Sequence, residues 1–387
     1  MNRSAADDAG IAARVAGSLA DASLLPTSIR AVLDYYATTG DLPLDAVRLQ
    51  RRVDAFVESV IADAFDDVER AIAETTGGDA DAVSFSYDTK LTMPAELTLG
   101  HVYQRARSDG STPVERAEAV TELVVVALLD GDMRDAINDA EFEDFLIEGV
   151  AVEREHAAEI AQKALQSHVE ELFDQFPEAV RDAYREAVDR SEAHQDRDPY
   201  FRELMADARD GDDDALDAIR EEYKHGAFAD PNGDGASDGP GDAESVIRPA
   251  DLFVDEERSF PYLKTQYGRV GVIYDGMIEM YRAAGVDVED TFKRSIVFTI
   301  IGAQIWLDDI DDYADDLADV QLTPVTAEYL LADADYEAYR NVVEATNEYL
   351  GAAERYAAET DSQLAGIGAN YVFYSGDPSV LPGHDRK

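Results

Sequence analysis

Apolar residues recur every three or four positions along most of this chain, which is the spacing of one face of an α-helix. The pattern is clear in segments 53–73, 147–173, 180–188 and 270–284, and in two longer segments that begin at residues 114 and 287. Almost no segment alternates apolar and polar residues with the period of two that a half-buried strand shows. The pattern therefore predicts an all-α fold.

Interruptions of the helical pattern divide the chain into five parts. We expect residues 1–82 to form N-terminal helices that pack on a helical bundle, and residues 83–208 and 251–362 to form the two halves of that bundle. Residues 209–250 are acidic and contain many glycines, so burial cannot offset their ordering entropy and we expect a disordered insertion. Residues 363–387 carry scattered glycines and prolines and are expected to be a loose C-terminal tail.

The helix expected over residues 287–319 changes character within one turn. Its apolar run at 296–301 reads as a core helix, yet Asp308 and Asp309 follow almost directly. On a regular helix one face would carry a stripe of aspartates: Asp308, Asp312, Asp315, Asp316 and Asp319. Like charges at this spacing repel, and Mg2+ bound through one or two carboxylates, water and substrate phosphates would relieve the repulsion. The alternative is a solvated acidic surface.

The composition favours that alternative and also limits the function. The formal net charge is −50, the sequence pI is about 4.2, and lysine is scarce, which is typical of a protein kept soluble in high salt; we expect a halophilic source. Such a surface argues against nucleic-acid binding. There is no cysteine, and the six histidines are scattered, so disulfides are excluded and a zinc site is not expected. No apolar run is long enough to span a membrane, so a cytoplasmic protein is expected.

The long apolar helix that begins at Val114 also ends in acids: Asp130, Asp132 and Asp135, with Arg134 among them. A helical bundle can bring two such helix ends face to face. Three other short motifs stand out along the chain: Lys90 to Pro94, Glu192 to Asp196, and Tyr262-Leu263-Lys264-Thr265.

Taken in order, these landmarks resemble those of the trans-isoprenyl diphosphate synthase (polyprenyl synthetase) family. Lys90 and Pro94 resemble its entry motif, and the segment 130–135 is similar to its first aspartate-rich motif. Lys264-Thr265 looks like its Lys-Thr motif, and Gln304 with Asp308-Asp309-x-x-Asp312 is similar to its second aspartate-rich motif. The resemblance runs from about residue 87 to residue 324 and implies a class I isoprenoid synthase-like helical bundle around a central apolar cavity.

The resemblance also implies a function and roles for individual residues. The chain would be a Mg2+-dependent prenyltransferase of isoprenoid biosynthesis that ionises an allylic prenyl diphosphate, and it would form a homodimer. Two sets of aspartates would hold the metal: Asp130, Asp132 and Asp135, and Asp308, Asp309 and Asp312. The substrate diphosphate would be contacted by a further set: Lys90, Arg134, Lys264, Thr265 and Gln304. Lys264 and Asp308 would act directly in catalysis.

Departures from the family pattern leave two alternatives open. The entry arginines are replaced by Leu91 and Met93, and Gly131 interrupts the first aspartate-rich motif. The Arg-Arg-Gly that normally follows the first motif is also absent. In the family these arginines recognise the homoallylic diphosphate. A terpene cyclase-like enzyme that uses one prenyl diphosphate would tolerate their loss, and so would a catalytically inactive partner or scaffold of the same fold.

Overall fold

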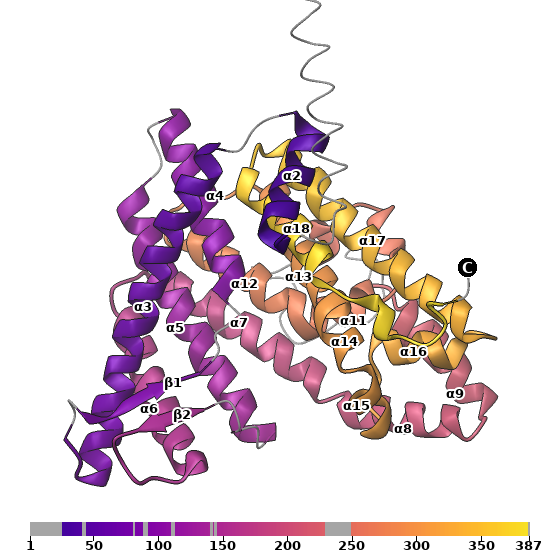
Figure 1. Cartoon of the computed structure of the whole chain (residues 1–387), viewed down its shortest axis with the longest axis horizontal. Coiled ribbons are helices and arrows are strands. Elements are labelled where there is room, and N and C mark those ends of the chain that lie inside the picture. Colours follow the sequence, from indigo (N-terminus) through magenta and orange to yellow (C-terminus); the bar gives the residue numbers. More distant parts are fainter. Residues whose placement is uncertain are drawn as a thin grey trace, which may run out of the picture. The chain divides into compact units, whose positions relative to one another are not determined.

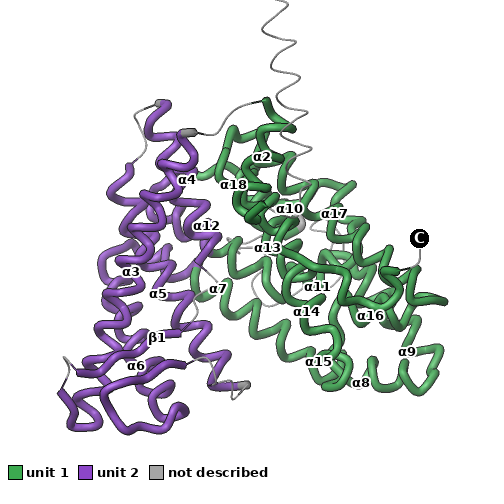
Figure 2. Tube along the Cα trace, in the orientation of Figure 1, with its two compact units in different colours: residues 1–44, 184–276, 288–387 green, residues 45–183, 277–287 purple. Residues whose placement is uncertain are grey.

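The structure, a computed structural model, describes residues 25–40, 44–79, 82–87, 92–109, 113–139, 142, 145–228 and 249–385. The described residues are mostly helical, which confirms the all-α prediction (Figure 1). They divide into two compact units, of which unit 1 comprises residues 1–44, 184–276 and 288–387, and unit 2 comprises residues 45–183 and 277–287 (Figure 2). Helices α7 (Glu178–Gln195) and α12 (Val272–Ala283) contribute residues to both units.

Unit 2 is a set of long helices with a small ribbon. Its helices are α3 (Leu44–Thr76), α4 (Met93–Asp109), α5 (Val114–Asp139) and α6 (Arg154–Phe173). α5 packs against α4 and α6. The guanidinium of Arg52 in α3 pairs with Glu118 of α5 at 3.0 Å and lies over the ring of Tyr103 in α4. β1 (Ser84–Ser86) and β2 (Leu146–Glu148) pair antiparallel, and such short strands leave no period-two pattern in the sequence.

Unit 1 is organised around α13, which is buried along nearly its whole length, as its apolar run predicted. The α-helices of unit 1 are α2 (Thr27–Thr39), α8 (Asp198–Arg209), α9 (Asp213–Ala218), α10 (Pro249–Leu252), α11 (Leu263–Gln266), α13 (Asp290–Ala303), α14 (Asp309–Asp311), α15 (Tyr313–Ala318), α16 (Pro324–Leu331), α17 (Asp335–Glu359) and α18 (Gln363–Ser375). Unit 1 also contains two short 3-10 turns, η4 (Glu257–Ser259) and η7 (Pro378–Val380), and three π-helical turns among its described residues. α13 packs against α17 and α18. Gly302 allows this approach, because a Cβ there would lie 2.6 Å from Leu350 of α17.

Two segments that the sequence predicted to lack regular structure contain helices. Residues 213–224, inside the predicted insertion, form α9 and a π-helical turn, and Asp212 caps α9 by accepting bonds from two backbone N–H groups. Residues 363–375, inside the predicted tail, form α18, whose apolar side is buried and packs against α2, α13 and α17. Residues 229–248 lie outside the described part of the chain, so the disorder expected there stays a prediction.

The helix predicted over residues 287–319 is not continuous. α13 ends at Ala303 and is followed by a π-helical turn, the three-residue α14 and the six-residue α15. Of the predicted aspartate stripe, Asp308, Asp312, Asp315 and Asp319 are exposed and Asp316 is half-buried, whereas the adjoining Asp309 is buried. A break in the regular helix changes the register of the side chains that follow it, which no periodic pattern anticipates.

Candidate functional site

Three π-helical turns occur among the described residues, and all three lie in unit 1. They are η3 (Ile219–Lys224), η5 (Tyr267–Gly271) and η6 (Gln304–Asp308). Each contains a backbone bond of the i→i+5 type: the N–H of His225 donates to Arg220, that of Val272 to Tyr267, and that of Asp309 to Gln304. π-helical turns are rare and occur frequently at functional sites. Their side chains are therefore candidates for a functional site.

The turns η5 and η6 are joined by an ion pair. The guanidinium of Arg269 in η5 donates to Oδ1 of Asp309 at 2.9 Å, and Asp309 is the residue whose N–H closes η6. The amide of Gln304 donates to Asp308 and lies 3.5 Å from the same Oδ1 of Asp309. Burial lowers the pKa of Arg269, but Asp309, Tyr223 and Asp308 together outweigh it, and the pKa lies above its usual value. Arg269 is thus a permanent cation beside the second aspartate-rich motif.

Asp309 is the buried carboxylate of the second aspartate-rich motif. Its side chain is 1% exposed, and its Oδ2 atom has no hydrogen-bond partner among the described residues. Burial raises the pKa of Asp309 to about 6, although Arg269 acts in the opposite direction. Burial and the charge of Asp309 raise the pKa of the nearby Asp316 to about 7. An ionised carboxylate held inside the protein with one unmet oxygen is costly, so this oxygen is a position where a cation would be stabilised.

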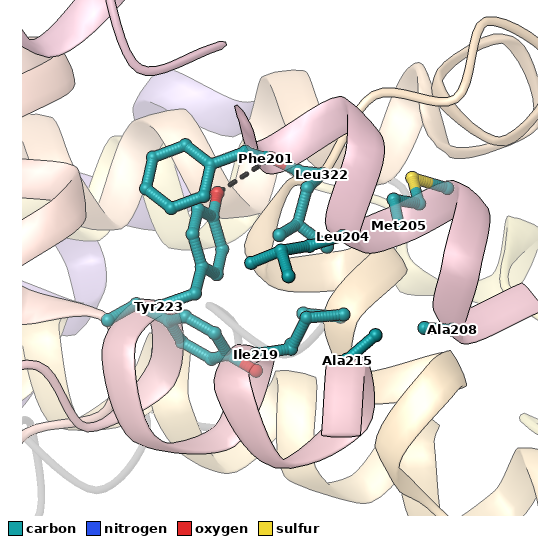
Figure 3. Packing of buried hydrophobic residues seen from close by; sticks show 10 residues of the cluster. Phe201, Leu204, Met205, Ala208, Ala215, Ile219, Tyr223 and Leu322 are labelled. Atoms are coloured by element: carbon teal, nitrogen blue, oxygen red, sulfur yellow. Dashed lines mark hydrogen bonds between the residues drawn. The ribbon is translucent and has the colours of Figure 1, made fainter. Parts of the chain in front are cut away.

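The third π-helical turn, η3, carries Tyr223, which lies near enough to Arg269 and Asp309 for their charges to act on it. Its hydroxyl donates to the backbone oxygen of Leu322 at 2.7 Å, as the dashed line in Figure 3 shows. After burial, the charges of Arg269 and Asp309 are the largest influences on the pKa of Tyr223, which lies above its usual value. Tyr223 belongs to a cluster of buried side chains from α8, α9, η3, the residue before α11 and the residues around α16: Phe201, Leu204, Met205, Ala208, Ala215, Ile219, Tyr262, Leu322 and Ala327. This cluster holds η3 against the acidic segment.

The Lys264-Thr265 motif begins at a strained residue. Tyr262, directly before α11, has a φ of 69°, in the left-handed region that non-glycine residues rarely adopt. It is held there because its N–H donates to the carbonyl of Lys224 at 2.6 Å and its hydroxyl donates to Glu328 at 2.7 Å. The hydroxyl of Thr265 is buried and donates to the carbonyl of Tyr223 at 3.1 Å. Thr265 therefore ties α11 to η3, and Lys264 is half-buried beside it.

His194 lies against the turn that carries Arg269. A Cβ at Gly268 would come within 2.8 Å of its Nδ1 atom, so glycine is needed there for the two segments to approach. Burial and then the charges of Arg197 and Arg269 lower the pKa of His194 to about 4. The imidazole is neutral at physiological pH and adds no charge to the site.

The first aspartate-rich set lies in unit 2, at the end of α5. Asp130 is 2% exposed and accepts bonds from Arg134 at 2.8 Å and from Gln162 of α6 at 3.2 Å. Asp132 is half-buried and Asp135 is exposed. The charges of Asp132 and Asp130, after burial, raise the pKa of Tyr87, whose hydroxyl donates to the carbonyl of Leu129. The prediction that this set faces the second set stays a prediction, and Lys90 lies outside the described residues.

Gln304, Asp308 and Asp309 form a local group in unit 1, but not a ready-made metal cage. Within the described ranges, no three aspartate, glutamate or histidine side chains are arranged to hold a metal ion by themselves. Mg2+ does not require such a cage, because one or two carboxylates with water and phosphate oxygens suffice. The unmet oxygen of Asp309 and the exposed carboxylate of Asp308 fit that chemistry.

Sequence reasoning did not find Arg269 or Tyr223. A signal for Arg269 was present: it is the one charged residue in the sequence between Lys264 and Asp275. No local signal marked Tyr223, which lies in the segment predicted to be disordered.

The chain matches no protein-family model, and no curated protein matches it either. None of the described helices is long and apolar enough to cross a membrane.

Proposed function

We propose that this protein is a Mg2+-dependent enzyme of the trans-isoprenyl diphosphate synthase type, which ionises an allylic prenyl diphosphate. The helical architecture is compatible with that proposal, and a buried apolar helix leads directly into the carboxylates of the second motif. The observation that carries it is Asp309: a carboxylate oxygen without a partner, buried beside a permanent cation and next to the exposed carboxylate of Asp308. Cations and phosphate oxygens are the groups that such a pairing of charges would recognise.

In this proposal different residues of unit 1 have different roles in binding the metal and the substrate. Asp308, Asp309 and Asp312 would hold Mg2+, which when bound would stabilise the charge that develops on the departing pyrophosphate. Gln304 holds Asp308 by a hydrogen bond. Lys264 would contact the diphosphate, and the buried face of α13 would keep water from the allylic cation. Asp130, Asp132 and Asp135 of the first aspartate-rich set would also hold metal, and Lys90 and Arg134 would be further diphosphate contacts.

A second candidate is a protein of the same fold that does not catalyse, and one observation favours it. Both buried aspartates of the two motifs already have an arginine partner, Asp309 with Arg269 and Asp130 with Arg134. An internal cation can neutralise a buried carboxylate as a metal does, so neither motif needs a metal for the fold to be stable.

Release of pyrophosphate separates these candidates. The protein is incubated in molar KCl, with and without Mg2+, with geranyl, farnesyl or geranylgeranyl diphosphate, each with and without isopentenyl diphosphate. Release that requires isopentenyl diphosphate identifies chain elongation, and release without it identifies a cyclase-like enzyme. If no substrate yields pyrophosphate above the Mg2+-free control, the enzyme proposal fails and the inactive candidate stands.

Variants test whether the second motif performs the reaction. Asp308→Ala and Asp312→Ala are expected to abolish Mg2+-dependent release with no change in the helical circular dichroism spectrum, because both side chains are exposed. Asp311→Ala is the matched control: it removes an equally exposed charge from the same turn, outside the motif. An equal loss of activity in all three variants would show that only the total charge matters.

A further inference from the structure

Arg269 and a divalent cation would compete for the same carboxylate. The guanidinium lies 2.9 Å from Oδ1 of Asp309, and the side chain of Asp309 is 1% exposed. A divalent cation bound at Oδ2 of Asp309 would stand close to that guanidinium, and like charges at such a distance repel strongly in a poorly hydrated site.

Arg269 does not need to remain on Asp309. Its side chain is 27% exposed, whereas that of Asp309 is almost fully covered, so the arginine is the less enclosed member of the pair. A guanidinium also matches the oxygens of a phosphate group by two parallel hydrogen bonds. A diphosphate beside the motif would therefore offer Arg269 a second anionic partner and would leave Asp309 open to the metal.

We infer that Arg269 is an internal counter-ion that holds the place of the divalent cation on Asp309, so that diphosphate and Mg2+ bind in a coupled manner and each strengthens the binding of the other. The inference rests on the proposed function, because it assigns a regulating role at the same site. Arg269 is in this sense a positioning residue. Coupling of this kind is reciprocal, so it is measurable from either ligand.

The π-helical turn provides the probe that this inference needs. Trp306 is the single tryptophan of the chain and lies inside η6, two residues before Asp308 and three before Asp309. Its fluorescence reports binding at the motif independently of turnover. The titration uses MgCl2 alone, inorganic pyrophosphate alone, and MgCl2 at a fixed pyrophosphate concentration, all in molar KCl.

The wild-type protein is expected to bind Mg2+ weakly by itself, and on the order of tenfold more tightly in the presence of pyrophosphate. In Arg269→Gln the competitor is absent, so Mg2+ alone is expected to bind on the order of tenfold more tightly than to the wild type, and pyrophosphate adds little. Arg340→Gln is the matched control, because Arg340 is 53% exposed and its partner Glu344 lies 3.6 Å away on the surface of α17. This control is expected to behave as the wild type does.

The outcomes separate this inference from the proposed function. If Arg269→Gln binds Mg2+ no better than the wild type and pyrophosphate still strengthens binding, the counter-ion role is overturned while the site stands. If neither protein binds Mg2+ together with pyrophosphate, both the inference and the proposed function fail.

Should Arg269→Gln not fold, Arg269→Lys takes its place. A lysine keeps the charge but lacks the planar fork, so tighter binding of Mg2+ alone and weaker coupling are expected. Binding identical to that of the wild type in Arg269→Lys would overturn the inference.

Discussion

The indole nitrogen of Trp306 donates to the backbone oxygen of Phe373 at 2.9 Å, and the rings of these two residues stack with centroids 6.0 Å apart and planes 3° from parallel. Trp306 lies in η6, and Phe373 lies near the end of α18. The C-terminal helix is thereby fastened to the turn that carries Gln304 and Asp308. The segment predicted to be a loose tail instead supports the candidate site.

Gly376 makes this attachment possible, so Gly376→Ala is expected to disturb it. A Cβ at this position would lie 2.2 Å from the indole nitrogen, and the ring must move. We expect a loss of about 1–3 kcal/mol in the free energy of unfolding, a shift of the Trp306 emission, and weaker binding of Mg2+ with pyrophosphate. Gly351→Ala is the control, since no atom lies within 4 Å of a Cβ there. Equal behaviour of the two variants would contradict the role given to Gly376.

Glu328 is expected to be among the most sensitive carboxylates in unit 1. It is 2% exposed and accepts bonds from Lys224 at 2.7 Å, from the strained Tyr262 at 2.7 Å, and from Asn341 at 3.1 Å. Glu328→Gln leaves the ammonium of Lys224 without its counter-charge, and urea denaturation is expected to show a loss of roughly 3 kcal/mol. The surface variant Glu344→Gln is expected to change the value by less than about 0.5 kcal/mol. A loss in Glu328→Gln no larger than that of the surface variant would refute the prediction.

Glu354 makes the stability depend on pH. Burial, followed by the charge of Asp34, raises the pKa of Glu354 from 4.5 to about 7. Because the pKa of the folded state is the higher one, ionisation destabilises the fold; this effect is absent below about pH 4.5, grows as the pH rises, and is complete above about pH 7. Glu354→Gln is therefore expected to be about 1–3 kcal/mol more stable than the wild type at pH 8 and nearly equal to it at pH 5. Urea denaturation at both pH values checks this, and an equal difference at both would contradict it.

The first aspartate-rich set offers two variants with opposite expectations. Asp130 is buried and bonded to Arg134 and Gln162, so Asp130→Asn is expected to lower the free energy of unfolding by about 1–3 kcal/mol. Asp135 is exposed, so Asp135→Asn should leave the stability within about 0.5 kcal/mol. If the set also holds metal, Asp135→Asn weakens the binding of Mg2+ with pyrophosphate, measured by Trp306 fluorescence. If the binding of Mg2+ with pyrophosphate is unchanged in Asp135→Asn, Asp135 is not a metal ligand.

Much of the helical framework could be predicted from the sequence. The start of the helix at Val114 and the buried run 296–301 follow directly from apolar periodicity. Thr323 followed by Pro324 is a typical helix start, and Thr323 and Thr326 form a reciprocal capping box at the beginning of α16. These features depend on contacts between neighbours in the chain, and for this reason they are visible in local patterns.

The sequence by itself determined that this protein is an acidic, helical chain with two groups of aspartates at the ends of long apolar helices. Only the tertiary structure decided that Asp309 turns inward while Asp308 and Asp312 remain exposed, and that Arg269, 40 residues earlier, is its partner. A π-helical turn gives up regular local hydrogen bonding, and packing between distant segments must compensate for it. Contacts such as those of Tyr223 with Leu322 and of Trp306 with Phe373 hold these turns, and no pattern within a single helix encodes them.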